Sequence, residues 1–154
     1  MDGEWLRWRG RAGEVEVALA GGHEVVALPD GEPVTAAAVR LLASFCEPLR
    51  MGFAVVYTAR KTDLVRATGF PELDAAFTVT TDYAADAVTL LDDAELRARM
   101  VALLGEKKLP VKLRQAEIEL VVREPARARA LVRAAIDVVA RLGARARELG
   151  FTVA

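Results

Sequence analysis

The feature that most constrains this chain is a long, one-sided apolar stripe near its C-terminus. From about Ala126 to Leu149, apolar residues recur at the 3, 4, 3, 4 spacing of one α-helical face. The stripe consists of Val132, Ala135, Ile136, Val139, Leu142, Ala146 and Leu149. A helix of that length measures about 36 Å, and Gly150 is a stop signal. The pattern predicts a long C-terminal helix that packs one face on the rest of the fold.

Two shorter helices are predicted between residues 83 and 104, each preceded by an aspartate. Asp82 is expected to cap "YAADAVTLL". Asp92 and Glu95 have the spacing of a capping box, and Leu91 and Leu96 have that of a hydrophobic staple. Gly105 would end the second helix. The expected buried faces are Ala84, Val88 and Leu91 in the first helix, and Leu96, Met100, Leu103 and Leu104 in the second.

Alternation of apolar and polar residues predicts several β-strands. "GEVEVALAGGHEVVALPDG" alternates on both sides of Gly21-Gly22, and two glycines suit a two-residue hairpin turn. Strands at about 14–20 and 23–28 follow from that turn. "GFAVVYTAR" and "FTVTT" are also typical of strands, because branched and aromatic residues favour them.

"PVTAAAVRLLASFCEPL" has two interpretations. Thr35 followed by three alanines is typical of a capped helix, whereas the residues from Ala37 to Phe45 also form a face of period 2. The neighbouring segments are predicted strands, so we favour a strand over residues 34–45.

"LPVKLRQAEIELVVRE" predicts a second hairpin with Gln115-Ala116 as its turn. That register places opposite charges on one face and apolar groups on the other, and each cross-strand pair contributes roughly 0.2–1 kcal/mol. The pairs are Arg114 with Glu117, Lys112 with Glu119, Leu113 with Ile118 and Val111 with Leu120. Gln-Ala is a poor two-residue turn, so a longer loop is the alternative.

These elements predict an α+β fold: an antiparallel, meander-like sheet covered by helices at about 83–104 and 126–149. The length of 154 residues favours a single domain, 1–154, with residues 1–12 as an N-terminal arm.

The segments "TGFPELDAAFTVTT" and "LLDDAELRARMVALL", followed by a hairpin and a final helix, resemble small uncharacterised proteins common in myxobacterial genomes. Those proteins share a Thr-Gly, Phe-Asp-x-x-Phe-x-Val, Leu-Leu and helical Arg pattern. The matching residues here are Thr68-Gly69, Asp74, Phe77, Val79, Leu90-Leu91 and Arg97. Leu73 replaces the usual Phe, and Gln115-Ala116 replaces the frequent Asp-Gly turn. The resemblance covers roughly residues 10 to 145 and implies a shared fold, but it implies no activity.

Composition narrows the possible functions. A net charge of −1 provides no overall field toward nucleic acid or anionic membrane. No apolar run approaches the roughly 18 residues of a transmembrane helix, and the N-terminal segment lacks the apolar middle of a signal peptide. Cys46 is the only cysteine and has no internal disulfide partner. We therefore expect a cytoplasmic protein.

No catalytic, nucleotide or metal motif is present in the sequence. His23 and Cys46 are isolated, whereas a metal site needs several ligands at workable spacing. We therefore predict no metal and no cofactor, and we expect Cys46 to be a small buried residue. Asp74 is predicted to accept hydrogen bonds from turn N–H groups, with Leu73 and Phe77 packed inward.

Two candidate contact surfaces remain. Arg129, Arg133, Arg141 and Arg145 share one side of the final helix and form a candidate face for an anionic partner. A solvated face is the alternative, and the helix lacks the aromatic groups that stack on RNA bases. The N-terminal segment contributes Trp5, Trp8, Arg7 and Arg9, a candidate protein interface because tryptophan and arginine are frequent at interface hot spots.

The sequence favours a non-catalytic protein-binding or assembly module that binds a protein partner or a second copy of itself. The alternative is an enzyme or small-ligand-binding protein whose site is assembled from residues remote in sequence. A deep pocket with convergent polar groups, for example near Asp74, Asp82 and Arg97, would favour that alternative.

Overall fold

The computed structural model describes residues 6–27, 33–57, 68–105 and 111–153. Its elements, in chain order, are β1 (Leu6–Ala12), β2 (Val15–Ala27), β3 (Pro33–Phe45), β4 (Phe53–Tyr57), α1 (Pro71–Asp74), β5 (Phe77–Thr81), α2 (Ala84–Leu91), α3 (Ala94–Leu104), β6 (Val111–Arg114), β7 (Glu117–Val122) and α4 (Pro125–Glu148).

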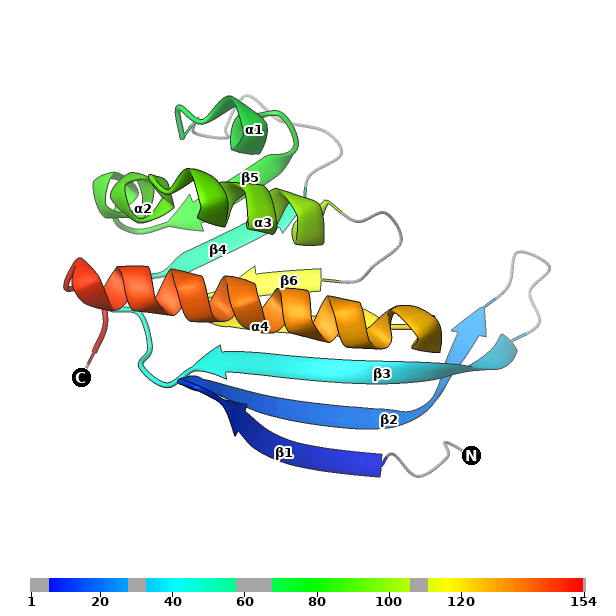
Figure 1. The fold of residues 1–154 in the computed structure, drawn as a ribbon. Helices are drawn as coiled ribbons and strands as arrows, with labels where there is room; N and C mark the ends of the chain where they lie inside the picture. Colours follow the sequence, from blue (N-terminus) through cyan, green and yellow to red (C-terminus); the bar gives the residue numbers. More distant parts are fainter. Residues whose placement is uncertain (1–5, 28–32, 58–67, 106–110, 154) are drawn as a thin grey trace.

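The strands form one antiparallel sheet in the order β1-β2-β3-β7-β6-β4-β5. The helices lie on one face of this sheet, where α4 runs along β3 and packs on β3 and β7, with α3 beside it (Figure 1). The predicted α+β class and the long C-terminal helix are confirmed. The β6–β7 hairpin is inserted between β3 and β4, so the sheet brings together segments remote in sequence.

The segment 34–45 is a strand, as favoured. β3 pairs with all 13 residues of β2, from Ala27 opposite Pro33 to Val15 opposite Phe45. Leu41, Ala43 and Phe45 of the predicted period-2 face are buried. The backbone hydrogen bonds of this long ladder satisfy groups that a helix would have satisfied within the segment.

The predicted turn at Gly21-Gly22 is wrong. β2 continues through both glycines, which pair with Val39 and Ala38 of β3. Glycine weakens a strand interior, but pairing with the long strand β3 keeps the chain extended here. The tight turn lies earlier, at Gly13-Glu14, where Gly13 has a φ of 61° and connects β1 to β2.

The predicted register of the second hairpin is confirmed. Arg114 lies opposite Glu117, and Leu113 lies opposite Ile118. The two-residue turn forms without glycine, although Gln115 has a φ of 57°. Tertiary hydrogen bonds hold it: Gln115 N–H donates to Phe53 O at 2.7 Å, and Phe45 N–H donates to Ala116 O at 2.9 Å. The longer-loop alternative is therefore excluded.

Both predicted aspartate caps are wrong. Asp82 does not cap α2, which begins after Tyr83. Instead, Asp82 Oδ1 accepts the Gly52 N–H at 2.7 Å, and this hydrogen bond joins the start of β4 to the end of β5. Asp92 follows α2, and the N-cap of α3 is Asp93, whose Oδ1 accepts the Leu96 N–H at 3.1 Å. Because the cap lies one residue later than predicted, Glu95 is not at the third helical position and the capping box does not form.

The helix faces agree with the sequence for α3 and differ for α2. Leu96, Met100, Leu103 and Leu104 are buried, as predicted. The buried residues of α2 are Ala87, Leu90 and Leu91, whereas Ala84 is exposed and Val88 is half-buried. α2 therefore packs on the core through Ala87 and Leu90 in place of Ala84 and Val88.

α4 ends at a glycine stop, as predicted. Gly150 has a φ of 76°, its N–H donates to Arg147 O, and the Phe151 N–H donates to Ala146 O. These two bonds are those of a Schellman motif. Inside α4, Gly143 lets the helix approach the core closely, because a Cβ built there would lie 2.1 Å from Phe45 Cγ. In the described residues, no helix has the length and apolar character needed to cross a membrane.

Candidate functional site

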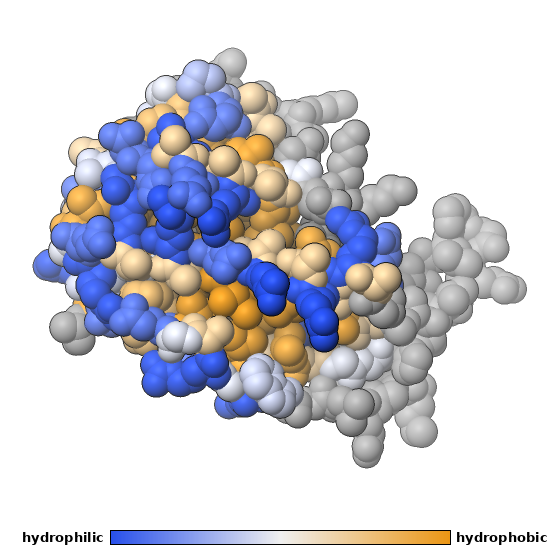
Figure 2. All heavy atoms as spheres, in the orientation of Figure 1, coloured by the Kyte–Doolittle hydropathy of each residue, from blue (hydrophilic) through white to orange (hydrophobic). Residues whose placement is uncertain are grey.

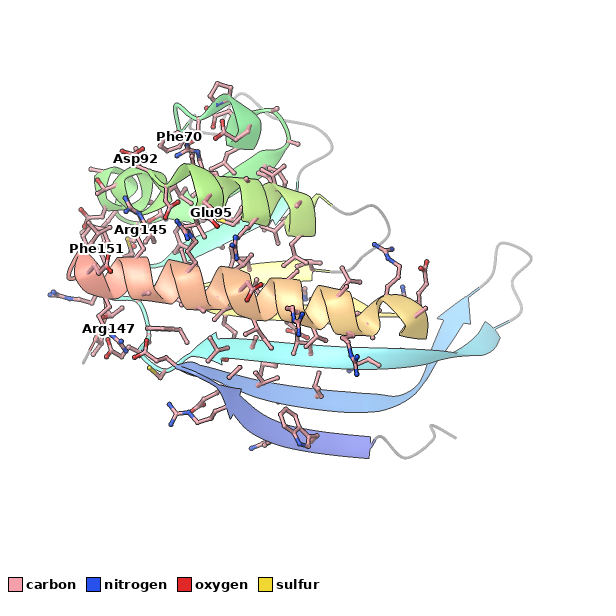
Figure 3. All side chains as sticks on the ribbon, viewed as in Figure 1. Phe70, Asp92, Glu95, Arg145, Arg147 and Phe151 are labelled. Atoms are coloured by element: carbon pink, nitrogen blue, oxygen red, sulfur yellow. The ribbon has the colours of Figure 1, made fainter. Side chains whose placement is uncertain are left out.

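The candidate anionic-partner face on α4 divides into two parts in the structure. Arg141 binds Asp93 through two hydrogen bonds of 3.1 Å, and also contacts Glu95 at 3.0 Å. Arg145 donates to Leu90 O and Thr89 O, both at 2.7 Å. Those carbonyls belong to the last turn of α2, where a cation is favourable. Figure 3 shows Arg145 pointing from α4 toward α2. These two arginines hold the helical layer together.

Arg147 forms a third connection at the same end of α4 (Figure 3). It pairs with Glu14 and with Glu47, and lies over the Phe45 ring with 4.9 Å to its centroid. The hydrogen bond from Arg147, with one from Thr152, lowers the pKa of Glu47. The hydrogen bonds to Glu14 and Glu47 raise the pKa of Arg147 above its ordinary value.

Cys46 lies beside this cluster and is exposed, so the expectation of a buried cysteine is wrong. It follows the last residue of β3, and its Sγ accepts a hydrogen bond from Arg147 at 3.3 Å. The chain turns away from the core here, where its backbone N–H donates to Glu14 O.

Asp74 occupies the predicted structural position. Its carboxylate accepts hydrogen bonds from Thr68 N, Thr68 Oγ1 and Gly69 N at 2.8–3.0 Å. Leu73 and Phe77 on either side are buried, as expected. The carboxylate therefore fixes the turn that precedes α1.

Arg97 and Asp82 do not join Asp74 in a shared site. Arg97 pairs with Glu72, donates to Leu91 O at 2.9 Å and lies over the Phe70 ring. Asp82 is bound to the Gly52 N–H. Each polar group is thus engaged with a different part of the scaffold.

The N-terminal half of α4 borders an apolar groove of about 530 Å³. Its floor combines residues of β1, β2, β3 and α4: Ala12, Leu19, Val39, Ala128, Val132 and Ile136. Arg129, Arg133 and Asp137 form its polar rim. Figure 2 shows hydrophobic atoms exposed in a hollow below α4, with hydrophilic residues beside them. The groove is an open trough.

Arg129 and Arg133 are exposed and have no ion-pair or hydrogen-bond partner among the described residues. They therefore differ from Arg141 and Arg145 on the same helix. The prediction of an anionic-partner face is untested, but the structure leaves only these two members available for such a contact. Asp137 is the only carboxylate of the rim, and Arg99 lies 3.8 Å from it.

Trp8 belongs to β1 and lies beside the groove. It pairs with Leu19, so the two side chains share the helix-side face of the sheet. The indole lies over Gly10, since a Cβ built there would be 2.4 Å from Trp8 Cη2. Even so, the Trp8 side chain is 55% exposed. Of the other members of this candidate interface, Arg9 is exposed, and Trp5 and the side chain of Arg7 lie outside the described residues.

The groove does not follow from the local patterns of the sequence. Alternation correctly assigned Leu19 and Val39 to the apolar face, and helical spacing correctly assigned Val132 and Ile136. All four were expected to be covered. They are only half-buried, because α4 does not extend over the whole apolar face of β1–β3. No local pattern in the sequence indicates how far α4 extends over the sheet.

In the described part of the chain, no group of three or more His, Cys, Asp or Glu side chains is arranged to hold a metal ion. The side chain of His23 lies outside the described residues. No family model, curated protein or solved structure matches this chain. Its resemblance to the myxobacterial proteins stays a prediction.

Proposed function

We propose that this protein is a non-catalytic binding module that docks a protein partner in the groove between α4 and the β1–β3 part of the sheet. The observation that carries the proposal is the combination of an exposed apolar floor with two guanidinium groups on its rim, Arg129 and Arg133, that have no partner in the described part of the chain. Apolar contact supplies most of the driving force in such an interface. The arginines add charge selectivity toward an acidic partner.

The shape of the groove favours a protein over a small molecule. Sites for small ligands typically enclose 70–90% of the ligand surface, whereas this groove is open along one side (Figure 2). A partner side chain or segment fills a trough while the rest of the partner covers its rim. Arg129 and Arg133 also extend into solvent, where a larger partner reaches them.

The chemistry of the rim favours binding over catalysis. Arginine stays protonated throughout the physiological pH range and so does not exchange protons with a substrate. Among the described residues that line the groove, Asp137 is the one carboxylate, and no second acid or base accompanies it. General acid–base catalysis relies on a side chain positioned to transfer a proton, usually with its pKa adjusted by neighbouring groups.

The test is site-specific photocrosslinking in the native cell. Benzoylphenylalanine replaces Ala128, in the floor of the groove, and in a matched control it replaces Lys112, which is exposed on β6. We expect a discrete protein adduct from position 128 only. We also expect the adduct to be lost in an Arg129→Glu, Arg133→Glu background. Equal adducts from both positions, or an adduct indifferent to charge reversal, would exclude the groove as the docking site.

A further inference from the structure

The free edge of β1 lies next to the groove. β1 is the first strand in the sheet order, and β2 is its only neighbour among the described strands. Its outer side therefore presents backbone N–H and C=O groups that a further strand can pair with. Ala12 of β1 also lines the groove, so the edge and the apolar floor form one continuous surface.

The side chains of β1 divide by chemistry between the two faces of the sheet. Trp8 and Ala12 are on the helix side, in register with Leu19 and Val15. Arg9 and Arg11 are exposed on the opposite side, where they line a second hollow of about 440 Å³. An added strand would thus meet an aromatic and apolar surface on one face and guanidinium groups on the other.

These arginines select against a second copy of β1. Arg7, Arg9 and Arg11 alternate along the strand. If two copies of β1 paired edge to edge in an antiparallel, two-fold symmetric arrangement, the central registers would consequently place arginine opposite arginine. Like charges directly opposite one another are destabilising. A strand with acidic residues at those positions has the opposite preference, so the same residues reject one partner and favour another.

The carboxylates near these arginines leave part of their charge uncompensated. Glu16 lies opposite Arg11 in the β1–β2 register, whereas Ala18 lies opposite Arg9. Neither arginine has an ion-pair partner among the described residues. Arg9 is therefore the stronger point of recognition.

We propose that β1 accepts an added strand from another protein, an extended segment in which acidic residues alternate with apolar ones. Its acidic side chains pair with Arg9 and Arg11, and its apolar side chains pack beside Trp8 toward the groove. Backbone hydrogen bonds to β1 supply affinity, and the alternating side chains supply specificity. This inference rests on the proposed function, because it specifies the partner of the same surface.

The probe is a panel of capped peptides long enough to span the 7 residues of β1, with glutamate alternating with valine, leucine or isoleucine. A control peptide has the same composition with its glutamates grouped at one end. Binding to the full-length chain is measured by fluorescence anisotropy of a dye-labelled peptide. We expect the alternating peptides to bind more tightly than about 1 mM and at least about tenfold more tightly than the grouped control.

Two further measurements distinguish strand addition from binding in the groove alone. Bound peptide should slow hydrogen exchange of the β1 amides, because the peptide pairs with their free side. N-methylation of every second peptide residue blocks one edge of the peptide strand. One of the two alternate methylation patterns should therefore abolish binding, and the other should leave it largely intact.

Charge reversal tests the role of the arginines. Arg9→Glu, Arg11→Glu should weaken binding of the glutamate peptide by about tenfold or more, and should improve binding of the corresponding lysine peptide. The matched control, Lys112→Glu, Arg114→Glu, makes the same change in net charge on β6. It should alter neither affinity by more than about threefold.

The inference is overturned if no alternating peptide binds more tightly than about 1 mM, or if bound peptide leaves the β1 amides unprotected. It is also overturned if light scattering finds a dimer of the full chain that breaks up in Arg9→Glu, Arg11→Glu, since the edge would then serve self-association. In the first two cases, an adduct from position 128 would still support the proposed function. Loss of that adduct tests the proposed function separately.

Discussion

The two halves of α4 both combine arginines with apolar residues, but their surroundings differ. In its C-terminal half, three arginines bind groups of α2, α3 and the ends of β2 and β3, while Val139, Leu142 and Ala146 are buried. In its N-terminal half, Arg129 and Arg133 border the groove, and Val132 and Ile136 are only half-buried. The stripe is therefore core in the C-terminal half, whereas in the N-terminal half it contributes both to the core, through Ala135, and to the accessible floor of the groove.

The largest expected difference concerns the apolar stripe itself. Val139→Ala removes two buried methyl groups and should destabilise the fold by about 2–3 kcal/mol. The same substitution at half-buried Val132 should cost less than about 1 kcal/mol, because the groove already exposes that side chain. Urea denaturation measures both losses of stability, provided that the dependence of the unfolding free energy on urea concentration is unchanged. Equal losses would mean that the groove is closed in solution.

Gly143 tests how closely the C-terminal half packs. Gly143→Ala should gain roughly 1 kcal/mol of helix propensity. It should nevertheless destabilise the fold by about 1–2 kcal/mol, since its Cβ collides with the Phe45 ring. In a Phe45→Ala background, the same change should be neutral or stabilising. A stabilising effect in the wild-type background would show that helix and strand separate easily here.

The arginines should show the same asymmetry. Arg145→Ala leaves two carbonyls at the end of α2 without their donor and should cost about 1–2 kcal/mol. Arg133→Ala, the matched control, should change stability by no more than about 0.5 kcal/mol, because Arg133 is exposed and has no partner among the residues that the structure describes. Thermal and chemical unfolding of the two variants provide the comparison, which fails if their losses are equal.

The smallest effect separates the two adjacent aspartates. Asp93→Ala should cost about 0.5–2 kcal/mol through loss of the α3 cap, whereas Asp92→Ala should cost less than about 0.5 kcal/mol. If Asp92 were the cap, the Asp92→Ala variant would be the less stable of the two. Denaturation midpoints at neutral pH decide between them.

The contribution of Asp93 to the free energy of unfolding should also depend on pH. Burial acts to raise the pKa of Asp93, but the hydrogen bonds from Arg141 and Leu96 outweigh it and leave the pKa below its ordinary value. A carboxylate whose pKa is lowered in the folded state stabilises the fold at pH values above its unfolded-state pKa of about 3.9. This stabilisation is lost as the pH falls through the folded-state pKa. The difference between wild type and Asp93→Asn should therefore shrink below about pH 4.

Local patterns predicted the elements whose partners are close in sequence. The β6–β7 register followed from charge and apolar alternation alone, and the buried face of α3 followed from helical spacing. Gly21-Gly22 was misassigned because distant β3 keeps those residues extended. The α3 cap was misassigned by one residue because Asp92 and Asp93 are chemically equivalent in sequence, and Arg141 forms its hydrogen bonds with the second. The α2 cap was misassigned because Asp82 binds the distant Gly52 N–H instead.

The candidate site was less predictable than the fold. Alternation and helical spacing indicate which residues are apolar on one face, but not which part of that face another element covers. The groove exists because α4 does not cover the sheet as far as β1, and α4 is held in this position by its packing on β3 and by the arginine contacts near its C-terminal end. Those contacts join residues remote in sequence.

The position of β7 between β3 and β6 has a consequence for synthesis of the chain. Ser44 of β3 and Glu117 of β7 are neighbours in the sheet and are 73 residues apart in sequence. A ribosome adding 5–20 residues per second takes roughly 4–15 s to make that interval. During this time the nascent β3 presents Leu41 and Ala43 at an unpaired edge, before the strand and the helix that cover them have emerged. Slower translation would prolong this exposure, so the rate of elongation and the supply of chaperones should influence how much of the protein is recovered folded.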